Sequence, residues 1–215
     1  MSSRISRHTP LTGVAFFALL AVGFALTWNS PDSSASAGKV ISYYRDHQHQ
    51  ERVGSYLVGL SIFFGLFFVG KLCGYLRQRE GRLATVAFGG FLLFAAAGGI
   101  AAGTGWALAD RPHQLTPGAA QALNLASNGL IALTFAAGLG VFLFAAGLAI
   151  LRSGLLPRAL GWLALVFGVV GLTPLGWFSI FALGVIVLIL VPLLYQRDVE
   201  PAREGTSTSE SYAMV

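Results

Sequence analysis

The chain has 215 residues, of which 55% are hydrophobic and 11% are charged, and its mean hydropathy is +0.70. Soluble domains carry about 25% charged residues, so this composition excludes an ordinary soluble domain and indicates a membrane protein. The net charge of +5 does not indicate nucleic-acid binding, because the basic residues lie in short loops beside apolar segments. The single cysteine, Cys73, excludes a disulfide within the chain.

The first apolar segment, residues 11–28, follows a polar N-terminal tail, residues 1–10. A basic start, an apolar run and Ala35-Ser36-Ala37 also fit a cleaved signal peptide. The apolar run is longer than the usual signal-peptide core of about 7–15 residues and ends well before Ala35. We therefore expect an uncleaved first transmembrane helix and keep the signal peptide as the alternative.

The longest polar connection is residues 29–52. Pro31-Asp32-Ser33-Ser34 is typical of a helix start, because Asp and Ser side chains accept hydrogen bonds from free backbone amides. Val40, Ile41 and Tyr44 then fall on one helical face. This pattern predicts a short amphipathic helix lying on the outer membrane surface, with an ordinary solvated loop as the alternative.

The rest of the chain divides into further apolar spans. Residues 156–195 would form a helix of about 60 Å, twice the thickness of the hydrocarbon, so Thr173-Pro174-Leu175-Gly176 is expected to break it. The six predicted spans are residues 11–28, 53–76, 83–109, 119–151, 158–173 and 177–195. Residues 196–215 are polar and are predicted to form a disordered tail.

The charges indicate the orientation. With the N-terminus inside, ten basic residues fall in inner segments and four, Lys39, Arg45, Arg52 and Arg111, in outer segments. This distribution follows the positive-inside rule and places both termini in the cytoplasm. The four tryptophans also fall at predicted membrane boundaries: Trp28, Trp106, Trp162 and Trp177.

Glycine is abundant and spaced for close helix contact. The patterns are Gly70-x-x-x-Gly74, Gly99-x-x-x-Gly103 and the series Gly154, Gly161, Gly168 and Gly171. They leave open whether the facing helix belongs to the same chain or to another subunit. Gly154 also follows Arg152-Ser153, which predicts a helix end with this glycine in the left-handed conformation.

Several chemistries are disfavoured. The interiors of the predicted spans contain no Asp, Glu, His or Arg, which argues against proton-coupled transport and against a haem held by histidine. Lys71 lies about one turn from a span end and can extend to the interface. No nucleotide-binding, catalytic-serine or zinc motif occurs, so we predict no catalytic residue, metal site or cofactor.

The outer connections hold the first candidate site. Imidazole and carboxylate groups could bind a divalent metal if the two loops met, although a solvated polar surface is the expected state. The residues concerned are Asp46, His47, His49, Glu51, Asp110 and His113.

Span four holds the second candidate site. Gln121, Asn124 and Asn128 are three and four residues apart and form one stripe on a helix. They either join helices through hydrogen bonds or line a polar pocket. Counting back about 20 residues from Arg152 places the stripe at the outer rim of the membrane, where it meets residues 29–52. The candidate ligand-binding residues are Gln121, Asn124, Asn128, Tyr44, His47 and His113.

Several short patterns resemble those of a family of small six-span integral membrane proteins of unknown function from actinobacteria. They are Trp28 with Pro31-Asp32, Tyr43-Tyr44, Leu76-Arg77 with Glu80-Gly81, and Arg152-Ser153-Gly154-Leu155-Leu156-Pro157-Arg158-Ala159-Leu160-Gly161-Trp162. The resemblance covers most of residues 10–195. It implies the fold and topology and carries no catalytic residues.

These observations predict an all-α polytopic protein of the cell membrane, a bundle of six transmembrane helices with a short outer amphipathic helix. The leading functional hypothesis is a non-enzymatic accessory or interaction subunit, or a binder of lipid or another apolar molecule. Expected partners are membrane lipid and a protein partner or second copy at the glycine-rich faces. The alternatives are a transporter of a neutral or amphiphilic solute, and a membrane enzyme with an outer-face site that uses Asp32, Asp46, His47 or His113.

Overall fold

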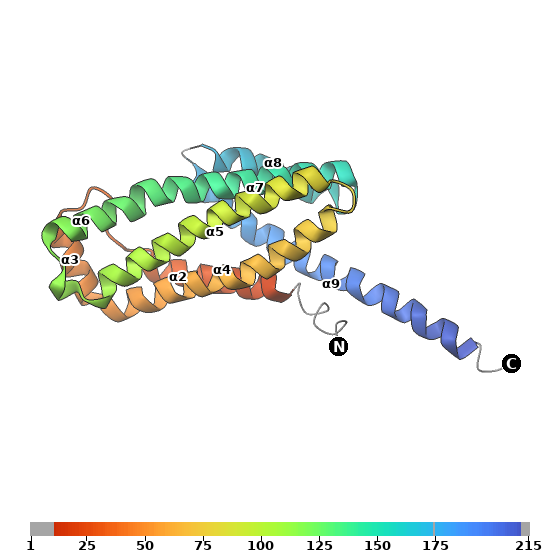
Figure 1. Cartoon of the computed structure of the whole chain (residues 1–215), viewed down its shortest axis with the longest axis horizontal. Helices are drawn as coiled ribbons and strands as arrows, with labels where there is room; N and C mark the ends of the chain where they lie inside the picture. The colour runs from red at the N-terminus through yellow and green to blue at the C-terminus, as the bar shows by residue number, and fades with distance from the viewer. Residues whose placement is uncertain (1–10, 174, 212–215) are drawn as a thin grey trace.

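The computed structural model describes residues 11–173 and 175–211, and every regular element among them is helical (Figure 1). The elements are α2 (Thr12–Thr27), α3 (Ala37–Asp46), α4 (Gln48–Leu76), α5 (Gly81–Asp110), η2 (Pro112–Gln114), α6 (Pro117–Leu125), η3 (Ala126–Ile131), α7 (Ala132–Ser153), α8 (Arg158–Gly171), η4 (Gly176–Phe178) and α9 (Ser179–Ser211). The all-α prediction is confirmed for this part of the chain. The predicted N-terminal tail, residues 1–10, lies outside the described residues.

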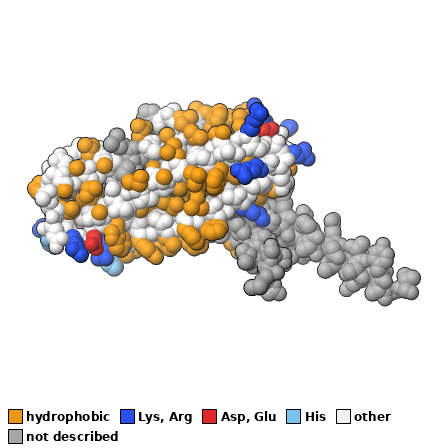
Figure 2. All heavy atoms as spheres, viewed as in Figure 1, with side chains coloured by type: hydrophobic (Ala, Val, Ile, Leu, Met, Phe, Trp, Pro, Cys, Tyr) orange, Lys and Arg blue, Asp and Glu red, His pale blue; other side chains and the backbone are white. Residues whose placement is uncertain are grey.

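Four helical segments are long and apolar enough to cross a membrane: Gln48–Leu76, Gly81–Asp110, Pro117–Ser153 and Ser179–Gln196. α2 and α8 are apolar but have only 16 and 14 residues, about 24 and 21 Å at 1.5 Å per residue. On the face seen in Figure 2, hydrophobic side chains cover the middle of the molecule, and Lys and Arg lie toward its two ends. Four of the six predicted spans therefore have the length that a crossing requires.

The long helices lie side by side, and the two ends of the bundle differ (Figure 1). α2 packs along α4, α4 along α5, α5 along α7, and α7 along α8. We call the end that carries α3 and α6 the cap end. We call the opposite end, with the α4–α5 and α7–α8 turns, the turn end.

Helix α3 covers the cap end. Val40 and Tyr44 are buried against Leu108 and Ala109 at the end of α5 and against Ala120 of α6. The predicted amphipathic helix exists, but its apolar face packs on protein rather than on the membrane surface. It also begins later than predicted, because the hydroxyl of Ser36 accepts the amide of Lys39 and starts the helix at Ala37.

The fourth predicted span is a helix with a π-helical turn inside it. α6 passes into α7 through η3, which is π-helical over Ala126–Ile131. A π turn inserts an extra residue and rotates the helix face that follows, so residues on α6 and α7 do not keep one α-helical register. The amide stripe therefore spans two elements, with Gln121 and Asn124 on α6 and Asn128 in η3.

Close helix contacts use one of the predicted glycine patterns and several glycines outside them, but not the GxxxG pairs. A Cβ on Gly147 of α7 would lie 2.6 Å from the Leu165 nitrogen of α8, and one on Gly23 of α2 would lie 3.0 Å from the Gly54 oxygen of α4. Gly161, Gly168 and Gly171 contact α7 as the series predicted. Gly70, Gly74, Gly99 and Gly103 are exposed, and a Cβ on each would meet no atom closer than 3.8 Å. The GxxxG spacing does not tell which side of a helix faces the bundle.

The later turns follow the prediction, and the C-terminal helix runs further. Gly154 has φ of 62° between α7 and α8, and α8 ends at Gly171, just before the expected break. α9 continues to Ser211 and so occupies most of the stretch for which composition predicts disorder. Pro201 and Gly205 lie within this extension, so intrinsic helix propensity does not account for it.

Candidate functional site

The amide stripe holds the connection between α2 and α3 in place. The Asn124 side chain donates to the Asp32 carbonyl oxygen at 2.7 Å. The Asn128 side chain donates to the Pro31 carbonyl oxygen at 3.1 Å and lies 3.1 Å from Asn124 Oδ1. Gln121 is exposed and takes no part in these bonds. Asn124 and Asn128 of the stripe therefore contact the 29–52 segment, as predicted. These contacts join elements of the cap end.

The held segment is itself a compact turn. Asp32 Oδ1 accepts both the backbone amide of Ser34, at 2.9 Å, and its hydroxyl, at 2.6 Å. The Ser34 bonds lower the pKa of the exposed Asp32 carboxyl group. Asp32 therefore stabilises the turn and does not face the interior. This position gives it no part in an enclosed site.

A buried carboxylate, Glu51, lies in the first turn of α4 with an exposed fraction of 1%. Its Oε1 accepts the Tyr43 hydroxyl at 2.9 Å and lies 2.8 Å from the Ser30 hydroxyl oxygen. The Ser30 hydroxyl also lies 2.7 Å from the Thr27 carbonyl oxygen, and its single hydrogen serves one of the two acceptors at a time. Hydroxyl groups from two other segments, the α2–α3 connection and α3, thus meet at one carboxylate oxygen of α4.

Two tyrosines of α3, Tyr43 and Tyr44, lie beside Glu51. Burial and the hydrogen bond to Glu51 raise the pKa of Tyr43 to about 12. Burial, followed by the charge of Glu51, also raises the pKa of Tyr44. Both phenols therefore keep their protons at neutral pH, and Tyr43 stays a hydrogen-bond donor. The His47 ring stacks on Tyr43 with centroids 4.4 Å apart and is exposed.

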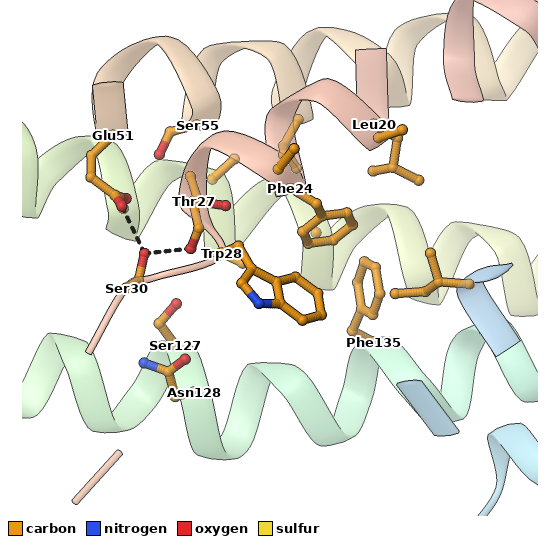
Figure 3. A pocket seen from close by; sticks show the side chains of 18 of the residues that line it. Leu20, Phe24, Thr27, Trp28, Ser30, Glu51, Ser55, Ser127, Asn128 and Phe135 are labelled. Atoms are coloured by element: carbon orange, nitrogen blue, oxygen red, sulfur yellow. Dashed lines mark hydrogen bonds between the residues drawn. The ribbon is translucent and has the colours of Figure 1, made fainter. Parts of the chain in front are cut away.

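Beside Glu51 the bundle contains a cavity of about 590 Å³ (Figure 3). Its wall comes from α2 and the connection after it, α3, α4, α5, η3, α7 and the start of α9. Figure 3 shows polar side chains of Ser30, Glu51, Ser55, Ser127 and Asn128 on one side, and aromatic and aliphatic side chains on the other. The apolar lining includes Phe17, Leu20, Phe24, Val58, Phe135 and Ile180.

The cavity opens sideways, toward the surface that a membrane would surround. Trp28, Phe181, Ala21 and Ala25 line it and are also exposed, with Trp28 at 76% and Phe181 at 64%. In Figure 3 the Trp28 indole lies between the polar groups and Phe135. Such an opening, between α2 and the start of α9, would admit a molecule from the lipid phase rather than only from water.

The histidine and carboxylate cluster does not assemble. His47, His49 and His113 are exposed, and no three His, Cys, Asp or Glu side chains come together within residues 11–173 and 175–211. Asp110 instead pairs with Arg52 at 3.5 Å and Arg111 at 3.6 Å. The outer cluster thus forms surface ion pairs.

The predicted and observed site residues overlap in part. Tyr44 and Asn128 line the cavity, and Asn124 supports its rim, whereas Gln121, His47 and His113 are not in its wall. The sequence analysis missed Ser30 and Ser55, and it placed Glu51 in a surface metal cluster rather than in a cavity wall. The available signal was the spacing of Glu51 and Ser55, which places two polar groups on one face at the start of an apolar helix.

Comparison of the chain with models of known protein families, with curated proteins and with solved structures finds no match. The resemblance to the six-span actinobacterial family therefore stays a prediction.

Proposed function

We propose that this chain is a non-enzymatic binder of a lipid-like amphiphile, held in a six-span bundle of the cell membrane with both termini in the cytoplasm. α2 and α8 would be the two short spans, each packed along a longer neighbour. The turn end, with Arg77, Arg79 and Arg152 near it, would face the cytoplasm.

The observation that carries the proposal is the cavity with one polar and one apolar side. Ligand sites in proteins have volumes of about 300–1,000 Å³ and few polar groups in an apolar wall. At about 30 Å³ per heavy atom, the volume of one water molecule in the liquid, 590 Å³ accommodates about 20 heavy atoms. This size suits a single-chain amphiphile.

The core between the cavity and the turn end favours binding over transport. The Phe16 and Phe91 rings pack edge to face at 5.9 Å, and Phe91 and Phe142 lie 5.6 Å apart. All three rings are at most 2% exposed. A solute moving toward the turn end would have to displace this packed cluster, so the cavity is better suited to hold a molecule than to conduct one.

Native mass spectrometry of protein extracted with its surrounding lipid tests the proposal. Wild-type protein should retain a bound amphiphile. Ala101→Phe places a large side chain in the cavity from its wall and should lose the amphiphile. Ala96→Phe is the matched control, because Ala96 is an exposed α5 residue outside the lining. Equal retention by wild type and Ala101→Phe, or no retention by wild type, would contradict the proposal.

A further inference from the structure

We infer that the cavity selects an amphiphile with a cationic amine head, which pairs with Glu51. The inference rests on the proposed binding function and adds the chemical class of the head group. Its basis is Glu51, a carboxyl group that the fold buries at the polar side of the cavity.

Glu51 forms no ion pair with Lys, Arg or His in the described part of the chain. Arg52, the next residue, pairs with Asp110 and lies over the Trp106 ring, 4.8 Å from its centroid. His47 lies one turn earlier, is exposed, and places Nδ1 3.1 Å from the Tyr43 carbonyl oxygen. The start of α4 contributes only a partial positive charge. A buried carboxyl group without an ion-pair partner either takes up a proton or pairs with a cation, and a ligand with a cationic head would supply that cation.

The hydrogen bonds leave one oxygen of Glu51 for such a ligand. The contacts with Ser30 and Tyr43 both fall on Oε1, and no described residue donates to Oε2. The two hydroxyl groups thereby fix the orientation of the carboxylate. Ser55, one turn further along α4, also lines the cavity and presents a hydroxyl group that can accept a second ammonium proton.

The rest of the cavity fits an alkyl chain attached to that head. An ammonium group with three donors could contact Glu51 and Ser55 while its chain passes Trp28 toward Phe24, Leu20 and Phe135. A fatty acid would instead bring a second negative charge to Glu51, which is unfavourable. Charge and shape therefore favour the amine over the acid of the same length.

The test compares three probes of equal chain length, dodecylamine, dodecanol and dodecanoic acid, on full-length protein in zwitterionic nanodiscs, with empty discs as the background. Wild type should bind dodecylamine about 10-fold more tightly than dodecanol, the ratio expected for a charge-assisted hydrogen bond. Glu51→Gln keeps the shape of the side chain and should reduce this preference to less than about 3-fold. Asp46→Asn removes an exposed carboxylate of the same end and should keep the wild-type preference.

The outcomes separate the two proposals. If the three probes bind equally and Ala101→Phe blocks them all, the cavity binds amphiphiles and the amine inference is wrong. If no probe binds above the empty-disc background, both the proposed binding function and the amine inference are wrong. A preference for dodecylamine that persists in Glu51→Gln would also overturn the role assigned to Glu51.

Discussion

The turn end and the cap end of the bundle are packed by different means. At the turn end α7 and α8 approach until backbone meets backbone, with Gly147 of α7 facing Leu165 and Gly161 of α8. At the cap end, side chains of Asn124, Asn128 and Glu51 join segments that are far apart in sequence. Near the cap end α2 and α4 also approach closely, at Gly23 and Gly54, but side chains hold the connection after α2 to η3.

This difference explains where the cavity lies. α2 packs closely along α4 at Gly23 and Gly54, but the polar turn after Trp28 separates it from η3. The space between these elements is the cavity, and its polar rim is made of the groups that hold the cap end together. Rigidity at one end and a ligand-sized space at the other therefore come from the same set of helices.

The largest expected effect comes from breaking the backbone contact at the turn end. In Gly147→Ala the new methyl group would lie 2.6 Å from the Leu165 nitrogen and 2.7 Å from the Gly161 oxygen. Since neither backbone atom can move alone, we expect a loss of about 2–3 kcal/mol in the free energy of unfolding, measured by denaturation in mixed micelles. Gly74→Ala is the control and should be neutral or stabilising by about 0.5–1 kcal/mol, because nothing lies within 4 Å of it. Equal changes in the free energy of unfolding for Gly147→Ala and Gly74→Ala would contradict the close packing of α7 and α8.

A smaller effect is expected from breaking the amide bridge at the cap end. Asn124 is 1% exposed, and Asn124→Leu leaves the Asp32 carbonyl and the Asn128 side chain without this partner. We expect the free energy of unfolding to fall by about 1–2 kcal/mol and hydrogen exchange to become faster in residues 29–36. Gln121→Leu, on the same helix but exposed, should change neither quantity. Unchanged exchange in Asn124→Leu would show that the turn is held by other contacts.

Alkaline pH should loosen the cap end through Tyr43. Its folded-state pKa of about 12 lies above the usual tyrosine value of 10.0, because burial and the Glu51 hydrogen bond disfavour the phenolate. The stabilisation by the neutral phenol is therefore complete below pH 10 and is lost as pH rises through about 12. The free energy of unfolding should fall between these pH values, and Tyr43→Phe should reduce this fall. Tyr56→Phe, at an exposed tyrosine, should leave it unchanged. A decline of the same size in Tyr43→Phe would assign it to another group.

Helix positions were predictable because they depend on local composition. The apolar runs, the break after residue 173 and the left-handed Gly154 each follow from residues that are neighbours in sequence. The contact of Asn124 and Asn128 with residues 29–52 also followed, because it needs only the rise per residue of a helix. These features require no knowledge of which helices pack together.

Features that depend on partners were not predictable. Glu51 seemed to be one of several loop carboxylates, and only the packing of α3 against α5 and α6 buries it near Tyr43 and Ser30. The π turn of η3 has no marker in the sequence that separates it from α-helix. The GxxxG motifs failed for the same reason, since spacing gives a face but not its neighbour.

The smallest expected effect concerns the charged surface of the cap end. Arg52 pairs with Asp110 at 3.5 Å and stacks over Trp106, but both charged side chains are more than a third exposed. Water and salt screen such pairs, so Arg52→Ala should cost less than about 1 kcal/mol, and the loss should shrink further as salt increases. Arg45→Ala, at the more exposed pair with Asp46, should have no measurable effect. If Arg52→Ala instead matched Asn124→Leu, charge rather than buried amide bonds would hold α4 and α5 together beside the cavity, and the polar rim would respond to salt as a surface does.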